Sequence, residues 1–274
     1  MKWYLFPKFF RQMNADELMA YCAREGIDGP TAMVRDGYWT PPDRLKDTIG
    51  SYVACAKKHG LEVKYADTPI DFKDPKASEE AYDILSSNGI EMIRLAYIER
   101  DDDRNPRALE DIGRRYAETA ARYAEKYGVR SVIQLHGGFY PHNASAAWPL
   151  VKDLDPRFIG IKLDPGNNFA QEGYEHFGYQ IRLLGEYIAA IGAKDGAPLR
   201  IGDPDVAKGW VRPFVPAYAG MADYKSIFPI LKETGFTGPA VLMPFYHEDN
   251  PELLMKEFTK EIAYLKSAAK EIQA

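Results

Sequence analysis

The sequence contains little cysteine and no long hydrophobic run. Its two cysteines, Cys22 and Cys55, fall on expected helix faces and form no Cys-x-x-Cys pair, which favours thiols in a reducing compartment over a disulfide. No apolar stretch approaches the roughly 18 residues that a membrane-spanning helix needs. The opening MKWYLFPKFFRQ is too short and too charged for the apolar region of a secretion signal. These absences predict a soluble, cytoplasmic protein with no membrane partner.

A basic surface is also missing from the chain. Lysine and arginine number 35 against 40 aspartate and glutamate residues, which gives a formal net charge of -5 and a pI near 5.7. Binding of nucleic acid needs clustered positive charge, because the phosphates must be neutralised. We therefore expect no nucleic-acid partner.

The sequence does contain a repeated cycle of a short β-rich run, a turn and an amphipathic helix. Eight such cycles fit into 274 residues, of which 46% are hydrophobic, so the chain can bury a large core. Strands that alternate with helices predict parallel β/α units, and roughly 250 residues is the usual size of an eight-stranded barrel. We predict an α/β protein with a single (β/α)8 TIM-barrel domain over residues 1–274. In this architecture the chemistry lies at the carboxyl ends of the strands.

The β-rich runs and the capping residues predict where the elements lie. The expected strands cover residues 3–6, 29–34, 61–66, 91–96, 131–135, 158–163, 188–193 and 240–243. Three helix starts are indicated by side chains that can cap, which are Asn14 with Glu17, Thr40 before two prolines, and Asp74 before Pro75. The clearest helical stripe runs over residues 109–127 and ends at Gly128.

A long segment over residues 195–220 interrupts this regular pattern. Loops of such length inside a compact domain are usually functional or disordered. Trp210, Phe214 and Tyr218 supply apolar surface that an ordered segment would bury. We therefore expect an ordered lid over the active site.

Four segments in the second half of the chain carry recognisable motifs. They are EKYGVRSVIQLHGG (125–138), IGIKLDPGNN (159–168), IAAIGAKDG (188–196) and AGMADYKSIFPILKETGFTGPAVLMPFYHED (219–249). Taken in this order, they resemble the sugar phosphate isomerase/epimerase family, which has a xylose isomerase-like TIM barrel. The resemblance implies that fold and an activity on small carbohydrates.

The resemblance also implies a divalent metal. The family holds it with a Glu after strand five, an Asp after strand six, a His on strand seven and a Glu on strand eight. Here the matching positions are Gln134, Asp164, Gly192 and Met243, so only Asp164 keeps a charged ligand. Because Gln and Met cannot move a proton as the family's two Glu residues do, the usual mechanism does not transfer unchanged.

A metal site rebuilt from neighbouring residues is one alternative. His136 follows Gln134 by two residues on an extended strand, so Gln134, His136 and Asp164 can offer three donors to Mn, Mg or Zn. His247 or Glu248 can complete this set. No organic cofactor is expected. Five histidines are too few for the trinuclear zinc site of the endonucleases that share this barrel.

Three residues at strand ends are candidates for catalysis, namely His136, Asp164 and Lys194. Asp164 opens an Asp-Pro-Gly-Asn sequence, so a carboxylate that stabilises a turn is the competing interpretation. His136 precedes two glycines and can equally be a loop histidine bonded to the backbone. Lys194 forms either an exposed ion pair or a partly buried amine that orients a substrate carbonyl or acts as a base.

Five residues are candidates for substrate binding, namely Arg94, Asn167, Asp195, Trp210 and Phe245. Arg94 lies in an apolar strand and needs a partner, which can be Asp67, Glu62 or a ligand anion. Asn167 can bind a sugar hydroxyl or close its own turn. The two aromatic residues can wall a sugar site or belong to the core.

The leading interpretation is a sugar phosphate isomerase/epimerase-like protein that acts on a small carbohydrate or polyhydroxy acid by proton transfer next to a carbonyl. His136 or Lys194 would be the acid or base, and Asp164 a metal ligand or orienting carboxylate. The alternative is a non-catalytic or partner-dependent barrel with a degraded metal site that binds a sugar-like ligand. A third interpretation is lyase-type cleavage of carbon-linked sugars. The expected partners are a small-molecule carbohydrate and, in a homo-oligomer, further copies of the chain.

Overall fold

The computed structural model describes residues 1–100, 105–171, 174–200 and 210–270, and its centre is a parallel sheet. The strands of this sheet are β1 (Trp3–Leu5), β2 (Gly29–Pro30), β3 (Ala32–Met33), β4 (Tyr65–Asp67), β5 (Met92–Arg94), β7 (Arg130–Gln134), β9 (Ile159–Leu163), β10 (Ile188–Ala193) and β15 (Ala240–Leu242). Their spatial order is β2-β1-β15-β10-β9-β7-β5-β4-β3. Because β2 and β3 are two segments of one strand on either side of Thr31, this order closes the sheet into a barrel.

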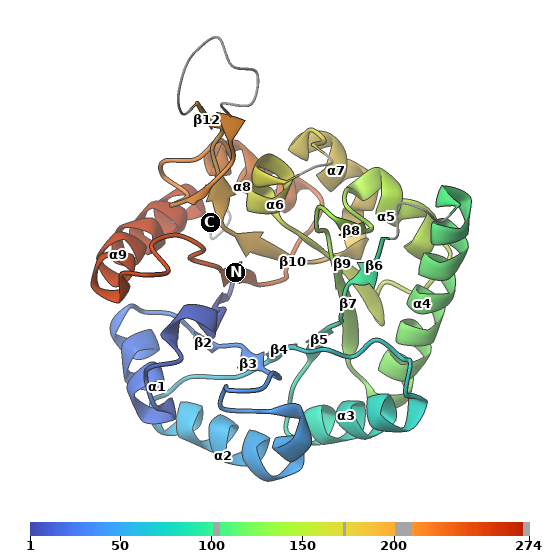
Figure 1. Cartoon of the computed structure of the whole chain (residues 1–274), viewed down its shortest axis with the longest axis horizontal. Coiled ribbons are helices and arrows are strands. Elements are labelled where there is room, and N and C mark those ends of the chain that lie inside the picture. Colours follow the sequence, from blue (N-terminus) through green and yellow to red (C-terminus); the bar gives the residue numbers. More distant parts are fainter. Residues whose placement is uncertain (101–104, 172–173, 201–209, 271–274) are drawn as a thin grey trace.

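Helices surround the barrel (Figure 1). They are α1 (Ala15–Arg24), α2 (Leu45–Lys58), α3 (Pro75–Ser87), α4 (Pro106–Tyr127), α5 (Ala144–Val151), α6 (Pro165–Ala170), α7 (Phe177–Leu184), α8 (Tyr224–Glu233) and α9 (Pro251–Ala268). The predicted TIM-barrel fold is confirmed. Within the described ranges, none of the helices has both the length and the apolar character needed to cross a bilayer.

Two of the predicted helix starts and one helix end are confirmed. Asn14 accepts the N–H of Glu17, whose side chain accepts the N–H of Asn14, which is a complete capping box. Asp74 caps α3 by accepting two backbone N–H groups. Gly128 ends α4 in the left-handed region at φ 65°, where a side chain would be strained.

The predicted helix start at Thr40 is wrong. The helix α2 begins only at Leu45, after a short 3-10 turn over Pro42–Arg44. The Thr40 hydroxyl donates instead to the carbonyl oxygen of Met33 at 2.7 Å. Thr40 therefore holds its loop against β3, and the two prolines that follow it open the 3-10 turn.

Several strands are shorter than the apolar runs that predicted them. The run over residues 61–66 yields β4, which begins only at Tyr65. Val63 in this run is buried, but the neighbouring Glu62 donates its N–H to Asp28 O outside the strand ladder. Burial therefore extends beyond the paired backbone at the bottom of the barrel.

The barrel has an outer and an inner core, which follow from the alternation of strand side chains. On β1, Trp3 and Leu5 belong to the large cluster that also contains the helix side chains. Tyr4 belongs to a second cluster with Tyr65, Val132 and other residues of the strands. Since successive side chains on a strand point to opposite faces, this second cluster fills the interior of the barrel.

The predicted lid contains two short antiparallel pairings. In this region β11 (Asp195–Gly196) pairs with β14 (Phe214–Val215), and β12 (Leu199–Arg200) pairs with β13 (Trp210–Val211). Another pair, β6 (Ile98–Glu99) with β8 (Phe139–Tyr140), lies on the loops after β5 and β7. Residues 201–209 lie outside the described ranges. The role of the segment as a lid stays a prediction, as does the single-domain organisation.

A buried carboxyl group ties α9 to the end of this segment. Glu261 is fully buried and accepts the N–H of Ala217 at 2.7 Å and the hydroxyl of Tyr246 at 2.7 Å. Burial raises the pKa of Glu261 from 4.5 to about 7, because the charged form is poorly solvated. The protonated form is therefore favoured in the folded protein.

This shift predicts how stability depends on pH. Since the folded-state pKa is raised, the contribution of Glu261 is complete below its unfolded pKa and is lost as the pH rises towards 7. We expect the wild type to lose about 2 kcal/mol more unfolding free energy than Glu261→Gln between about pH 5 and pH 8. Urea denaturation of both proteins measures the difference. Parallel pH curves for the two proteins would contradict the assignment.

Candidate functional site

Three strand ends bring polar side chains together at the carboxyl mouth of the barrel. Gln134 is the last residue of β7, Asp164 directly follows β9, and Lys194 directly follows β10. Gln134 Nε2 lies 2.6 Å from Asp164 Oδ2, and Lys194 Nζ lies 3.4 Å from the same oxygen. All three side chains are buried. They meet because all strands of a parallel barrel end on the same side.

The orientation of the Gln134 amide is fixed by its neighbours. Its Oε1 accepts from Arg94 Nε and from the Tyr97 hydroxyl, each at 3.2 Å, while its Nε2 donates to Asp164. Exchanging the amide oxygen and nitrogen would set an oxygen against a carboxylate and a donor against a guanidinium. The carbonyl oxygen of Gln134 therefore faces away from Asp164.

Asp164 caps the helix that follows it and also faces the mouth. Its Oδ1 accepts the N–H of Asn167 at 3.0 Å, at the start of α6, so the turn-stabilising interpretation is correct. Its Oδ2 is shared by Gln134 and Lys194. Both oxygens of this carboxylate consequently have protein donors.

Lys194 is a buried cation, so of the two interpretations offered for it the exposed ion pair is not formed. Its side chain is 3% exposed, and its Nζ donates to Asn167 Oδ1 at 2.6 Å. The rings of Phe214 and Phe245 lie 4.4 Å from the Nζ atom, within the range of cation–π contacts. Burial lowers the pKa of Lys194, and the charge of Asp164 acts in the opposite direction. Asn167 also donates to Leu135 O at 2.9 Å, which fixes its own orientation.

His136 lies beside this network and is bonded to other groups. Its Nδ1 lies 2.5 Å from Gly137 O, and because a carbonyl only accepts, Nδ1 carries the proton. Its Nε2 lies 3.2 Å from Gln171 Nε2, whose amide is oriented by a bond from Gly137 N to Oε1. Burial lowers the pKa of His136. The ring is therefore neutral near pH 7, with the Nε2 lone pair directed at Gln171.

A cavity of about 180 Å³ lies over these side chains. Its charged and polar lining includes Lys8, Arg35, Arg94, His136, Gln171 and Lys194. Phe245 and Gln134 line the same cavity, so five of the predicted site residues border one space. An adjoining cavity of about 310 Å³ shares Arg35 and Arg94 and adds Asp67.

Three of the predicted substrate-binding residues are not among the lining residues of this cavity, and the first of them, Asn167, bonds to Lys194 and to Leu135 O instead. The carboxylate of Asp195 is fully buried and accepts the N–H groups of Gly196, Met221 and Ala222, so it organises the loop before α8. Burial raises the pKa of Asp195 to about 6. The backbone of Trp210 pairs with Arg200, whereas its side chain lies outside the described part of the structure.

One buried cation, Lys162, was not predicted from the sequence. Its side chain is fully buried, and no hydrogen-bond partner of Nζ is found in the described residues. The rings of Tyr65 and Phe6 lie 5.5 Å and 5.9 Å away, and burial lowers the pKa of Lys162 to about 8. The signal was present in the sequence, because Lys162 is two residues before Asp164 and so shares its face of the strand.

Asp67, at the end of β4, was expected only as a partner for Arg94. The two side chains do form an ion pair, with Arg94 Nε 4.0 Å from Asp67 Oδ1. The other candidate, Glu62, bonds to the Tyr4 hydroxyl instead. Asp67 is 4% exposed, and among the described residues no donor lies within hydrogen-bond distance of either carboxylate oxygen.

The four positions that match the family's metal ligands do surround one point. A Cβ built on Gly192 would lie 3.1 Å from Asp164 Oδ2 and 3.2 Å from Met243 Sδ, and Gln134 contacts the same carboxylate oxygen. The side chains present do not fit a divalent cation. Gly192 has no donor, a thioether is a poor ligand for a hard ion, and the carbonyl oxygen of Gln134 faces Arg94. The ammonium of Lys194 would in addition repel a second cation.

The rebuilt three-donor site is not assembled either. The ring nitrogens of His136 are engaged by Gly137 and Gln171 rather than directed at Asp164. His247 and Glu248, which were expected to complete the set, are exposed and do not line the cavity over Lys194.

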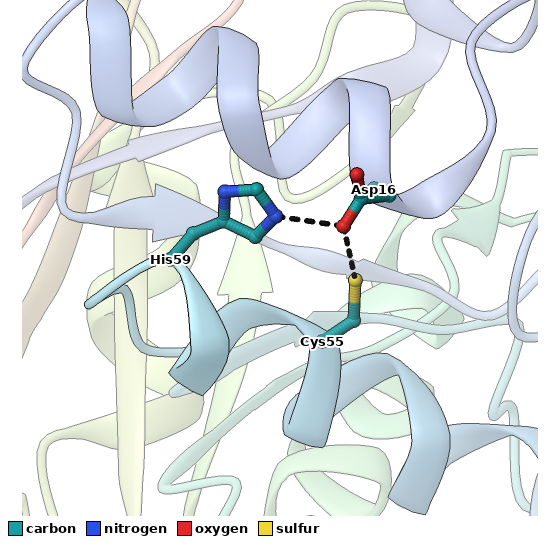
Figure 2. A group of neighbouring side chains, drawn as sticks. All are labelled: Asp16, Cys55 and His59. Carbon is teal, nitrogen blue, oxygen red and sulfur yellow. Dashed lines mark hydrogen bonds and ion pairs between the residues drawn. The ribbon is translucent and has the colours of Figure 1, made fainter.

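Among the described residues, one group of three Asp, Glu, His or Cys side chains has ligand atoms close enough to share a metal, and it lies elsewhere (Figure 2). Asp16 Oδ1 on α1 lies 2.8 Å from His59 Nε2 at the end of α2 and 4.0 Å from Cys55 Sγ. None of the three lines the mouth cavity. We interpret this group as a contact between the two helices. Both cysteines are free, as predicted.

The contact between Lys194 and Asp164 predicts strong energetic coupling. Removing one partner leaves a buried charge without compensation, which typically destabilises a protein by about 3 kcal/mol. We expect Lys194→Met and Asp164→Asn each to approach this loss, and the double variant to lose clearly less than their sum. Urea denaturation of the four proteins gives the coupling energy. Additive losses would show that the two groups do not depend on each other.

Comparisons with known proteins place the chain in a family. A family model for the xylose isomerase-like TIM barrel matches residues 19–268. Among curated protein sequences, no significant match is found. This family match confirms the resemblance that the strand-end motifs indicated.

Solved structures resemble the chain in fold at low sequence identity. A D-psicose 3-epimerase from Clostridium cellulolyticum H10, solved with D-tagatose, is 16% identical with a TM-score of 0.71, and the match covers 98% of this chain and 99% of that one. A xylose isomerase-like protein from Mycobacterium smegmatis in complex with magnesium is 16% identical with a TM-score of 0.71, over 98% and 97% of the chains. A probable 3-DHS dehydratase from Bacillus anthracis is 17% identical with a TM-score of 0.71, over 97% and 99%. Since the family model covers most of its length, this chain belongs to the xylose isomerase-like TIM barrel family.

Proposed function

We propose that the protein is an isomerase or epimerase-like enzyme that moves a proton next to the carbonyl group of a small polyhydroxy compound. The observation that carries this proposal is the buried network of Lys194, Asp164 and Gln134 under the mouth cavity. The sugar epimerases among the similar structures share the fold and support the substrate class by analogy only.

Lys194 takes the electrostatic role in this proposal. Removal of a proton next to a carbonyl places negative charge on the carbonyl oxygen, and a fixed donor at that oxygen stabilises the transition state. Lys194 has a buried, oriented Nζ that lines the cavity, and Asp164 keeps its charged form favourable. Arg94 lines the same cavity and is held by Gln134 and Asp67, so it can bind the same oxygen.

His136 is the proposed base. Its neutral ring offers a lone pair on Nε2, which is the form that accepts a proton. A substrate C–H group would have to replace Gln171, which now donates towards this atom at 3.2 Å. That contact favours the second candidate function, in which the barrel binds its ligand without catalysing a reaction.

Exchange of substrate hydrogen for deuterium tests the proposal. In D2O, the wild type should exchange the proton next to the carbonyl of at least one of D-fructose, D-tagatose and 5-keto-D-gluconate, as followed by NMR. Lys194→Met and His136→Gln should each slow this exchange on the order of 10²-fold or more, because each removes one catalytic group. His176→Ala, which changes an exposed histidine outside the cavity, is the matched control.

The same experiment separates the alternatives. Pretreatment with EDTA should leave the exchange rate unchanged, because the donor set does not fit a divalent ion. A ligand that binds the wild type but shows no exchange would contradict catalysis and support the non-catalytic barrel. Exchange that requires added Mn²⁺ would contradict the role given to Lys194.

A further inference from the structure

We propose that the two adjoining mouth cavities form one binding site for a polyhydroxy anion, a compound with several hydroxyl groups and one carboxylate or phosphate. This inference rests on the proposed function for its location and specifies the ligand class. The anionic group would bind on the side of Lys8, Arg35 and Arg94, and the hydroxyl groups would donate to Asp67.

The charges around the first cavity favour an anion. Four of its lining residues are cationic, namely Lys8, Arg35, Arg94 and Lys194, and none of the described residues that line it is a carboxylate. The buried carboxylate that pairs with Lys194, Asp164, already accepts from protein donors at both oxygens. Glu248 lies close enough to act electrostatically on Lys8, but it is exposed and borders another surface. A concave surface with one sign of charge concentrates ligands of the opposite sign.

Two of these cations are held in place by one aromatic ring. Lys8 Nζ lies 4.7 Å from the centre of the Phe245 ring, and Lys194 Nζ lies 4.4 Å from it. Lys8 also lies 4.8 Å from the ring of Phe9. Fixed ammonium groups lose little conformational entropy when an anion binds, so this arrangement favours binding.

The second cavity adds carboxylate acceptors to the two arginines that it shares with the first. Asp67 lines it, is almost fully buried, and has two carboxylate oxygens without hydrogen-bond donors among the described residues. A buried carboxylate needs such donors, because desolvation without hydrogen bonds is unfavourable. Neighbouring hydroxyl groups of a polyol are donors of the right kind. Arg35 and Arg94 line both cavities, so one ligand can contact the cations and Asp67 together.

The test uses four probes that separate charge from hydroxyl groups. D-gluconate carries both, D-glucitol carries hydroxyl groups alone, hexanoate carries charge alone, and glucitol 6-phosphate replaces the carboxylate by a phosphate ester. Isothermal titration calorimetry should show D-gluconate or glucitol 6-phosphate binding at least about tenfold more tightly than D-glucitol and hexanoate, since each of these lacks one charged or hydrogen-bonded contact. The tighter of the two anionic polyols identifies the anionic group.

Variants test which residues bind the anionic group of the ligand and which bind its hydroxyl groups. Arg35→Gln should reduce the advantage of the anionic polyol over D-glucitol, and Asp67→Asn should reduce its advantage over hexanoate. Arg11→Gln removes the same charge from an exposed residue that lines neither cavity, and it should change no affinity ratio. Because Asp67 also faces Arg94, melting temperatures are recorded for each variant. Arg35 is exposed, so its variant should fold even where Asp67→Asn does not.

Clear outcomes would overturn the inference. Equal affinity of the wild type for D-gluconate and D-glucitol would show that the cavities contain no anion site. An Asp67→Asn variant that weakens D-gluconate and hexanoate by the same factor would make Asp67 merely structural. The expected affinity order without any deuterium exchange would leave this inference standing while the proposed catalysis fails.

Discussion

A buried contact between an ammonium group and a carboxylate organises the mouth of this barrel. Lys194 and Asp164 are both shielded from solvent, so each charge requires the other and further polar groups. Gln134 donates to Asp164, and its amide oxygen then accepts from Arg94. Asn167 accepts from Lys194, and its amide nitrogen then donates to the carbonyl oxygen of Leu135. This chain of bonds fixes the positions of Lys194 and Arg94, two of the four cationic groups that line the cavity. The same contact lies among the four positions that the resemblance matches to the family's metal ligands.

Much of the barrel could be predicted from local sequence signals. The Asn14–Glu17 capping box and Gly128 after α4 depend on a few adjacent residues, and both were predicted correctly. Thr40 was misjudged because its hydroxyl bonds to β3, a contact that depends on tertiary structure. The strand limits were imprecise for a related reason. Apolar residues such as Val63 are buried beyond the hydrogen-bonded ladder, so the hydrophobic run is longer than the strand.

The candidate site was harder to predict, because strand ends identify neighbours but not orientations. Placing Gln134, Asp164 and Lys194 at the mouth follows from barrel topology alone. The rotation of the Gln134 amide and the engagement of His136 by Gln171 depend on residues far apart in sequence. Asp195 directly follows Lys194, yet its carboxylate binds the loop backbone. Lys162 was overlooked although strand alternation places it on the same face as Asp164.

The central claim is that the ammonium of Lys194 takes the place of a divalent cation beside Asp164. Crystals of the wild type soaked in MnCl2, with anomalous diffraction recorded at the manganese edge, test it most directly. The account predicts Lys194 Nζ in contact with Asp164 and no anomalous peak at this carboxylate. A manganese peak coordinated by Asp164, with Lys194 displaced from it, would contradict the account.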